Sequence, residues 1–142
     1  MSQLKIISLV PSITLLLFEL GLENNIVGRT KFCIQPKEKA PSIPTIGGTK
    51  NIDQQKIKLL QPTIIFATKE ENEKEQINQL KQDYKVVVFD IKNIDDNYKI
   101  IEKIGKLTST EQKANEIIQQ TKSNFQELEQ HLWQERDIFM IL

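Results

Sequence analysis

The fold is decided by Lys5-Ile6-Ile7-Ser8-Leu9-Val10-Pro11-Ser12-Ile13-Thr14, which runs into the apolar block Leu15–Gly21. The apolar run predicts a buried strand that ends at Pro11, because proline has no amide hydrogen to give to a sheet. The next block predicts a helix that Ser12 caps and Gly21 stops. Ligands of open α/β sheets bind beyond the carboxyl ends of strands, so this turn predicts part of a binding site.

Strand and helix patterns then alternate along the chain. Strands are predicted at Ile26–Gly28, Pro44–Ile46, Thr63–Ala67 and Val86–Phe89, and helices at 51–60, 68–81 and 95–107. Three polar pairs have the spacing of capping boxes: Asn51 with Gln54, Thr68 with Glu71, and Thr108 with Glu111. Uninterrupted apolar strands need cover on both faces, which crossover helices provide. The patterns therefore predict an α/β fold, a three-layer Rossmann-like lobe with a mainly parallel sheet.

A much longer helix is predicted over Thr110–Glu135, because apolar residues recur there at intervals of three and four. It would be about 39 Å long at 1.5 Å per residue. The strand-like run Ile138–Leu142 follows it. We expect this run to be the first strand of a further domain.

Composition limits the function classes. The chain has 142 residues, of which 39% are hydrophobic and 27% charged, as in an ordinary soluble domain. Lys+Arg and Asp+Glu both number 19, so bulk charge does not favour a nucleic-acid partner. Cys33 is the only cysteine, which excludes an intramolecular disulfide. No apolar stretch approaches the roughly 20 residues of a membrane span, and no signal-peptide pattern opens the sequence.

The chain resembles the substrate-binding proteins of ABC transporters for iron chelates and cobalamin, the class III periplasmic binding proteins of the helical-backbone metal receptor type. The strings that carry the resemblance are Ser8–Thr14, Val27–Cys33, Ile46–Asn51, Leu59–Ala67, Lys69–Asn72 and Val86–Asp90. It implies two α/β lobes that are joined by one rigid helix and clasp a ligand without catalysing a reaction. The implied partners are a membrane permease and a metal chelate, with cobalamin and ferric siderophore as leading ligands and no intrinsic cofactor.

The resemblance also implies a domain organisation and a location. Residues 1–108 would form the N-terminal ligand-binding lobe, 109–136 the linker helix, and 137–142 the first strand of a C-terminal lobe. The location would be periplasmic or at the cell surface if an export signal has been removed, and cytoplasmic as the sequence stands. A leaderless cytosolic enzyme or regulator on the same fold is the alternative. A truncated fragment without independent activity is a third interpretation.

The predicted ligand-binding residues lie in the loops that follow strands: Pro11, Ser12, Arg29, Lys31, Phe32, Gly47, Gly48, Thr49, Lys50, Thr68 and Lys69. Arg29 and Lys31 can meet an anionic chelate, and Phe32 can stack on a planar one. The alternative is a loop that buries Phe32 and the small thiol of Cys33. The Gly47-Gly48 turn lets backbone approach a ligand, although it is also an ordinary strand-to-helix turn without the spacing of a phosphate-binding loop.

The remaining polar candidates are weaker. Glu73 and Glu75 can complement a helix dipole, and the resemblance implies that one of them docks onto arginines of the permease. Many family members have histidine where this chain has Gln35, which argues against direct metal ligation here. His131 lies on the predicted long helix and is interpreted as a solvated or partly packed residue rather than a ligand. Asp90 ends a strand, but one carboxylate does not make an acid–base pair.

Overall fold

The computed structural model describes the backbone of residues 3–134 and the side chains as far as residue 126. The chain divides into two compact units, Met1–Asn97 and Tyr98–Leu142. The strand expected at Ile138–Leu142 lies outside the described residues, as does the side chain of His131.

The first unit is built on a four-stranded parallel sheet. Its strands are β1 (Ile6–Ser8), β2 (Ile26–Arg29), β3 (Ile64–Thr68) and β4 (Val86–Phe89), in the order β2-β1-β3-β4. All three neighbouring pairs run parallel, so each strand is followed by a crossover. This arrangement confirms the predicted α/β class and the parallel sheet.

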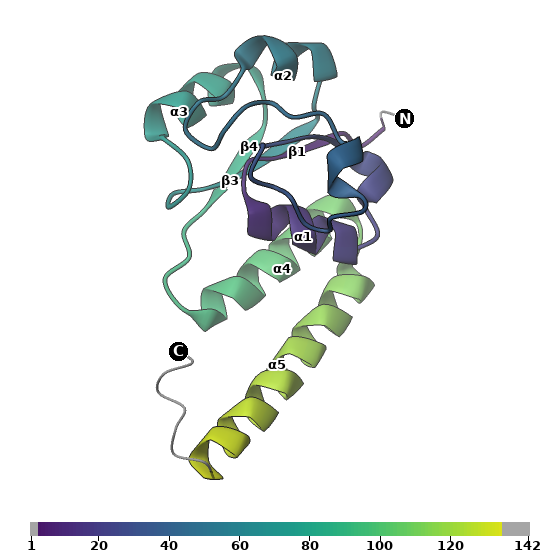
Figure 1. Cartoon of the computed structure of the whole chain (residues 1–142), viewed down its shortest axis with the longest axis vertical. Helices are drawn as coiled ribbons and strands as arrows, with labels where there is room; N and C mark the ends of the chain where they lie inside the picture. Colours follow the sequence, from purple (N-terminus) through teal and green to yellow (C-terminus); the bar gives the residue numbers. More distant parts are fainter. Residues whose placement is uncertain (1–2, 135–142) are drawn as a thin grey trace. The chain divides into compact units, whose positions relative to one another are not determined.

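Helices cover both faces of this sheet. Helix α1 spans Pro11–Glu19, α2 spans Gln54–Leu60 and α3 spans Lys74–Asp83. Figure 1 shows α2 and α3 on one side of the strands and α1 on the other. Single 3-10 turns occupy Glu23–Asn25 and Ala40–Ser42. Helix α4 (Ile94–Thr108) begins in the first unit and continues in the second.

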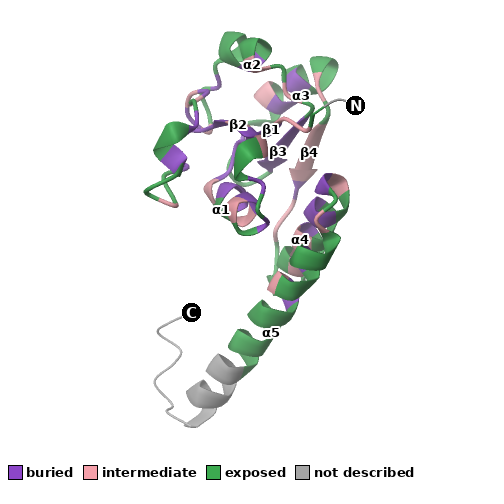
Figure 2. Ribbon diagram, turned by 90° about the vertical axis from the view of Figure 1, so that its right-hand side faces the viewer, coloured by how far each residue is buried: buried purple, intermediate pink, exposed green. Residues whose placement is uncertain are grey.

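The core lies on both faces of the two central strands. On one face, Ile7 and Ile65 pack in a buried cluster that includes Ile57 of α2 and Leu80 of α3. All five residues of β3 are buried, which Figure 2 shows as continuous purple in the middle of the sheet. This burial explains why the strands read as unbroken apolar runs rather than as alternating patterns.

A polar contact joins β1 to α1 on the opposite face. The Thr14 hydroxyl donates a hydrogen bond to Ser8 Oγ over 2.8 Å, and both side chains are fully buried. The predicted cap of α1 is wrong: the N-cap is Val10, no side chain caps the helix, and Ser12 is exposed. Pro11 takes the first helical position, where its missing amide hydrogen costs nothing and its fixed φ favours the helix.

Two further predicted caps are also wrong. Asp53, not Asn51, caps α2, because its carboxylate accepts from Gln55 N (3.1 Å) and Lys56 N (3.2 Å). The Thr68 hydroxyl accepts from Glu71 N as a capping box requires, but α3 begins only at Lys74. Residues 68–72 instead close a tight turn, since Asn72 N donates to Thr68 O.

The segment Pro44–Ile46 is not a full strand, although it lies beside β2. Arg29 N donates to Pro44 O over 3.0 Å and Ile46 N donates to Arg29 O over 2.8 Å. Thr45 forms only an isolated parallel bridge with Arg29. The chain leaves the sheet immediately afterwards at the Gly47 turn.

The second unit contains most of α4 and all of α5 (Glu111–Gln134). The 24 residues of α5 make a helix of about 36 Å at 1.5 Å per residue, which confirms the long helix. The third predicted capping box is wrong, because the Thr108 hydroxyl donates back to Ile104 O (2.7 Å) and closes α4. Ser109, with φ of 58°, then reverses the chain.

Candidate functional site

The loops that follow the parallel strands meet at one edge of the sheet, which we call the carboxyl edge (residues 9–12, 30–33, 47–52, 68–72 and 89–92). Lys31 N donates to Gly47 O over 2.8 Å, which joins the loop after β2 to the glycine turn. Lys69 N donates to Phe89 O over 3.0 Å, which joins the ends of β3 and β4. Segments that are far apart in sequence are therefore joined in pairs at this edge.

Lys31 and Phe32 present an aromatic ring and a cation on this edge. Phe32 is 53% exposed, so the alternative of a buried phenylalanine is wrong. The Lys31 ammonium lies 5.2 Å from the ring centroid of Phe32. A Cβ atom on Gly48 would lie 3.4 Å from Lys31 Cε and 3.5 Å from Phe32 Cε2, so both side chains reach over this glycine. Cys33 is fully buried beside Thr30, with 3.1 Å between sulfur and hydroxyl.

Arg29 lies inside the lobe rather than on its surface. It is only 8% exposed, and its guanidinium donates to the carbonyl oxygens of Ile43 (3.0 Å), Thr30 (3.3 Å) and Cys33 (3.4 Å). The bond to Ile43 O joins the loop after β2 to the segment that precedes Pro44, and the other two bonds fix the loop itself. The structure thus assigns Arg29 a structural role, and its predicted contact with an anion stays a prediction.

The turn Gly47–Lys50 has a backbone that only glycine adopts easily. Gly47 has a φ of 105°, and a Cβ atom there would collide with the Asn51 carbonyl oxygen. Gly48 N closes the turn by donating to Asn51 O over 3.1 Å. Thr49 is half-buried and Lys50 is exposed, so the tip carries one cationic side chain.

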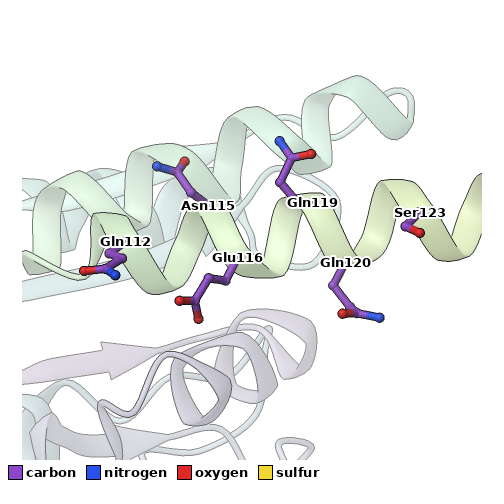
Figure 3. A pocket seen from close by; sticks show the side chains of 6 residues that line it. All are labelled: Gln112, Asn115, Glu116, Gln119, Gln120 and Ser123. Atoms are coloured by element: carbon purple, nitrogen blue, oxygen red, sulfur yellow. The ribbon is translucent and has the colours of Figure 1, made fainter.

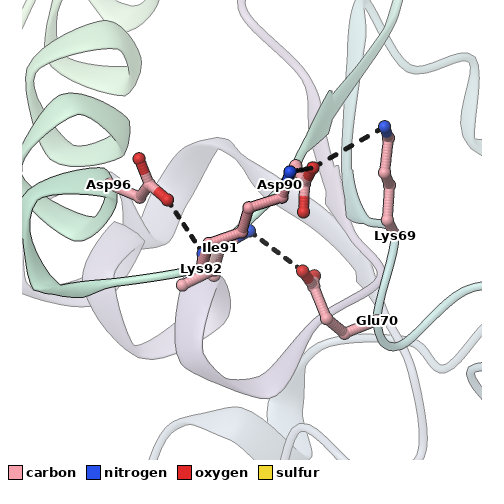
Figure 4. Close-up of polar contacts among 6 residues, drawn as sticks. All are labelled: Lys69, Glu70, Asp90, Ile91, Lys92 and Asp96. Carbon is pink, nitrogen blue, oxygen red and sulfur yellow. Dashed lines mark hydrogen bonds and ion pairs between the residues drawn. The ribbon is translucent and has the colours of Figure 1, made fainter.

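A charged network lies where β3 and β4 end (Figure 4). The Asp90 carboxylate lies 3.5 Å from Lys92 Nζ and 3.7 Å from Lys69 Nζ. Glu70 accepts from Ile91 N over 2.9 Å. Partial burial by itself would raise the pKa of Asp90. The attraction of Lys92, a hydrogen bond with Glu70 and the charge of Lys69 outweigh that effect, and the pKa of Asp90 lies below its ordinary value.

The remaining predicted site residues differ in how far they are exposed. Pro11 is half-buried and Ser12 exposed at the start of α1. Thr68 is 1% exposed, so it offers almost no surface to a ligand. Glu73 occupies the N-cap position of α3 without a capping bond, and Glu75 lies in the first turn. Neither glutamate forms an ion pair with another residue in the part of the chain that the structure describes.

Sequence reasoning missed Asn72, which connects the loops. Its amide nitrogen donates to Leu9 O (3.2 Å) and Thr49 O (3.1 Å), and its amide oxygen accepts from Thr68 N (3.0 Å). Asn72 is 7% exposed. Its signal in the sequence was a lone amide side chain in the turn after β3, which by itself does not reveal a partner.

One hollow adjoins this edge and another lies along α5. The first, of about 540 Å³, is lined by Thr68, Lys69, Asn72, Lys74, Ile77, Asn78, Lys81 and Val88. The second, of about 730 Å³, is lined by six polar residues of α5, Gln112 to Ser123, and contains none of the predicted site residues (Figure 3). Among the described residues, no group of three or more His, Cys, Asp or Glu side chains is placed to hold a metal ion.

Comparison with known proteins agrees with this architecture. The model of the family described as periplasmic binding protein matches residues 6–141. An uncharacterized ABC transporter substrate-binding lipoprotein of Bacillus subtilis strain 168, YvrC, is 31% identical over 130 residues, which are 89% of this chain and 41% of that protein.

Solved structures give the same result. A Staphylococcus epidermidis protein described as a possible iron-binding, periplasmic solute-binding protein is 29% identical with a TM-score of 0.78, over 87% of this chain and 49% of that one. The vitamin B12 binding protein BtuF of Vibrio cholerae has a TM-score of 0.81 at 21% identity, over 89% of this chain and 50% of that one. The second likeness concerns the fold alone. The chain thus spans about half the length, or less, of the proteins it matches.

Proposed function

Because this chain belongs to the periplasmic binding protein family, we propose that it supplies the N-terminal lobe of a substrate-binding protein. That protein would serve an ABC importer for a metal chelate, with cobalamin or a ferric siderophore as the ligand. Its role would be to hold the ligand and hand it to a permease, without catalysing a reaction. The name of the Bacillus subtilis relative supports the transport role.

The observation that carries this proposal is the exposed Phe32 ring at the carboxyl edge, with Lys31 over the ring and Lys50 exposed on the Gly47–Lys50 turn. Parallel α/β sheets bind ligands at this edge. An aromatic ring suits the flat or apolar part of a chelate, and ammonium groups suit its anionic periphery. Neither lysine forms an ion pair among the described residues, so both charges are open to a ligand.

In this proposal the lobe provides one side of a cleft. Residues 1–108 form the lobe, 109–136 the linker helix, and 137–142 the beginning of a second lobe that closes on the ligand by a small rigid-body movement. Affinity for such ligands depends on enclosure, so the lobe alone should bind weakly. The location would be the periplasm or the outer cell surface, which is supported by the descriptions of one relative as a lipoprotein and of another as a periplasmic protein. No helix within residues 3–134 is long and apolar enough to cross a membrane.

Titration of the complete natural protein with cyanocobalamin, haemin and ferrichrome tests the proposal. We expect one of them to bind, and Phe32→Ala and Lys31→Ala each to weaken that binding by about tenfold or more. The matched controls are Leu59→Ala and Lys58→Ala, since Leu59 is 84% exposed and both lie at the end of α2, remote from the carboxyl edge. They should bind like the wild type. If no chelate binds and a small metabolite is converted instead, the protein is an enzyme.

A further inference from the structure

We propose that two amide side chains, Asn72 and Gln76, act as an amide clamp that fixes the Gly47–Lys50 turn in its ligand-binding position. The inference rests on the proposed function. It concerns positioning residues, which shape the site through other groups and do not touch the ligand themselves.

Asn72 satisfies every hydrogen-bonding group of its buried amide on three different segments. The segment after β1 provides Leu9 O, the glycine turn provides Thr49 O, and the end of β3 provides Thr68 N. An amide offers two donors and one strong acceptor in one plane, which matches this set. Aspartate at position 72 could accept from Thr68 but could not donate to either carbonyl.

Gln76 holds the same turn from the first turn of α3. Its amide nitrogen donates to Lys50 O over 2.7 Å, and its amide oxygen accepts from Ile52 N over 3.2 Å. Asn72 and Gln76 therefore grip consecutive residues of the turn, 49 and 50, from one side. Asn72 lies two residues before α3 and Gln76 lies in its first turn, so one short segment provides both amides.

Backbone hydrogen bonds hold the two glycines of the turn, from Lys31 N to Gly47 O and from Gly48 N to Asn51 O, whereas Thr49 and Lys50 are held by the two amides. The tip of the turn contains two glycines, a threonine and an exposed lysine, so it buries almost no apolar surface that would hold it by packing. A loop that is ordered before the ligand arrives does not have to be ordered on binding, which improves affinity. The clamp therefore predicts tight binding without any contact between ligand and clamp.

The experiment compares Asn72→Ala and Gln76→Ala with the controls Asn78→Ala and Gln79→Ala, which remove exposed amides from the same helix. Amide hydrogen exchange is measured for residues 47–52 and for the strands. We expect at least tenfold faster exchange in the turn for both clamp variants, with residues 64–67 of β3 unchanged. Thr68 is left out of this comparison, because its amide loses its acceptor in Asn72→Ala. Affinity for whichever of cyanocobalamin, haemin or ferrichrome the wild type binds should fall about tenfold, at a temperature where every variant is folded.

Two further variants separate positioning from general stability. Gln76→Glu retains the oxygen that accepts from Ile52 N, so it should restore protection of that amide but not the contact with Lys50 O. The double variant Asn72→Ala/Gln76→Ala should lose less affinity than the sum of the single losses, because both act on one turn. Loss of stability alone would lower the unfolding midpoint without faster exchange confined to residues 47–52.

Unchanged exchange in the turn for Asn72→Ala and Gln76→Ala would overturn the clamp. Faster exchange with unchanged affinity would overturn its role in binding. If the wild type binds none of the three probes, the proposed function and the binding role fail together, while the exchange measurement still decides whether the clamp exists.

Discussion

At the scale of single residues, burial decides which polar side chains serve the fold and which face a ligand. Arg29 and Lys31 are two positions apart and carry the same charge. Arg29 is 8% exposed and bonded to three carbonyl groups, whereas Lys31 is exposed over Phe32. The first belongs to the loop's internal structure, and the second belongs to the carboxyl edge.

Arg29→Ala should therefore lower the free energy of unfolding by about 2–3 kcal/mol, because three buried carbonyl groups lose a charged donor. Lys31→Ala should change it by less than about 0.5 kcal/mol, as expected for an exposed side chain. Urea unfolding followed by circular dichroism measures both. Equal values for the two variants would contradict the structural role of Arg29.

The charged network predicts a titration at Asp90. Its pKa should lie below the ordinary value of 3.8, and Lys92→Ala should raise it, whereas Lys85→Ala at the other end of β4 should not. A folded-state pKa that is depressed favours folding above the unfolded-state value, and this contribution is lost as the pH falls through the folded-state value. Carboxyl carbon chemical shifts followed by NMR give the pKa directly; a value above 3.8 would contradict the network.

At the scale of elements, the ends of the helices are less regular than their middles. Gln61 follows α2 with a left-handed φ of 49°, a position where helices usually have glycine. Asp53 at the other end caps the same short helix with two hydrogen bonds. The N-terminus of α2 is thus well capped, whereas the backbone at its C-terminus is strained.

Gln61→Gly should raise the free energy of unfolding by about 0.5–1 kcal/mol, because glycine adopts a left-handed backbone without penalty. The same change inside the helix, Lys58→Gly, should lower it by about 1 kcal/mol. Thermal or urea unfolding of the two variants provides the comparison. The two changes in the free energy of unfolding should have opposite signs. A loss of stability at both positions would show that the strain at Gln61 is absent.

Helices α4 and α5 approach each other closely within the second unit. A Cβ atom on Gly105 would lie 2.6 Å from the Ala114 Cβ, far inside normal contact. Gly105→Ala should thus destabilise the chain by about 1–3 kcal/mol through overpacking, although alanine favours helices. Combining it with Ala114→Gly should recover part of the loss. A stabilising effect of Gly105→Ala in urea unfolding would rule out this close approach.

At the scale of the whole molecule, we propose that the lobe uses two different groups of exposed side chains. Those at the carboxyl edge contact the ligand, and Glu73 and Glu75 dock onto the permease. Both glutamates lie at the start of α3, exposed and without ion-pair partners among the described residues. Docking and ligand binding use different side chains, so variants should separate them.

Glu73→Lys and Glu75→Lys should reduce chelate import by the complete transporter, with at least one falling about tenfold, and should leave chelate affinity unchanged. The physical reason is that reversal of a docking charge places like charges opposite each other. Glu102→Lys on α4 is a control, since this glutamate is exposed and pairs only with Lys106 among described residues. Normal import by the double variant at positions 73 and 75 would refute this docking surface.

The sequence by itself determined the order and type of the main helices and strands, although Pro44–Ile46 forms only an isolated bridge in place of a strand. Apolar runs such as Val86–Phe89 and the three-four spacing of 111–134 are local patterns, and the structure has β4 and α5 at those places. The parallel sheet followed because such strands need helices on both faces. The resemblance to a known family then indicated that the loops after the strands form one candidate site.

Only the tertiary structure decided which partner each polar group found. Asn51 and Asp53 both suit a helix cap by their chemistry, and Arg29 and Lys31 both suit an anion. The roles of Arg29 and Lys31 separated because Arg29 found a hydrogen-bond partner farther along the chain, the Ile43 carbonyl. Asp53 rather than Asn51 became the cap because α2 begins at Gln54, after the turn that Gly47 and Ile52 close. Asn72 shows the same limit, since one of its three partners lies 63 residues away. A pattern of apolar residues is a local property, whereas a hydrogen bond of this kind depends on where the rest of the chain has folded.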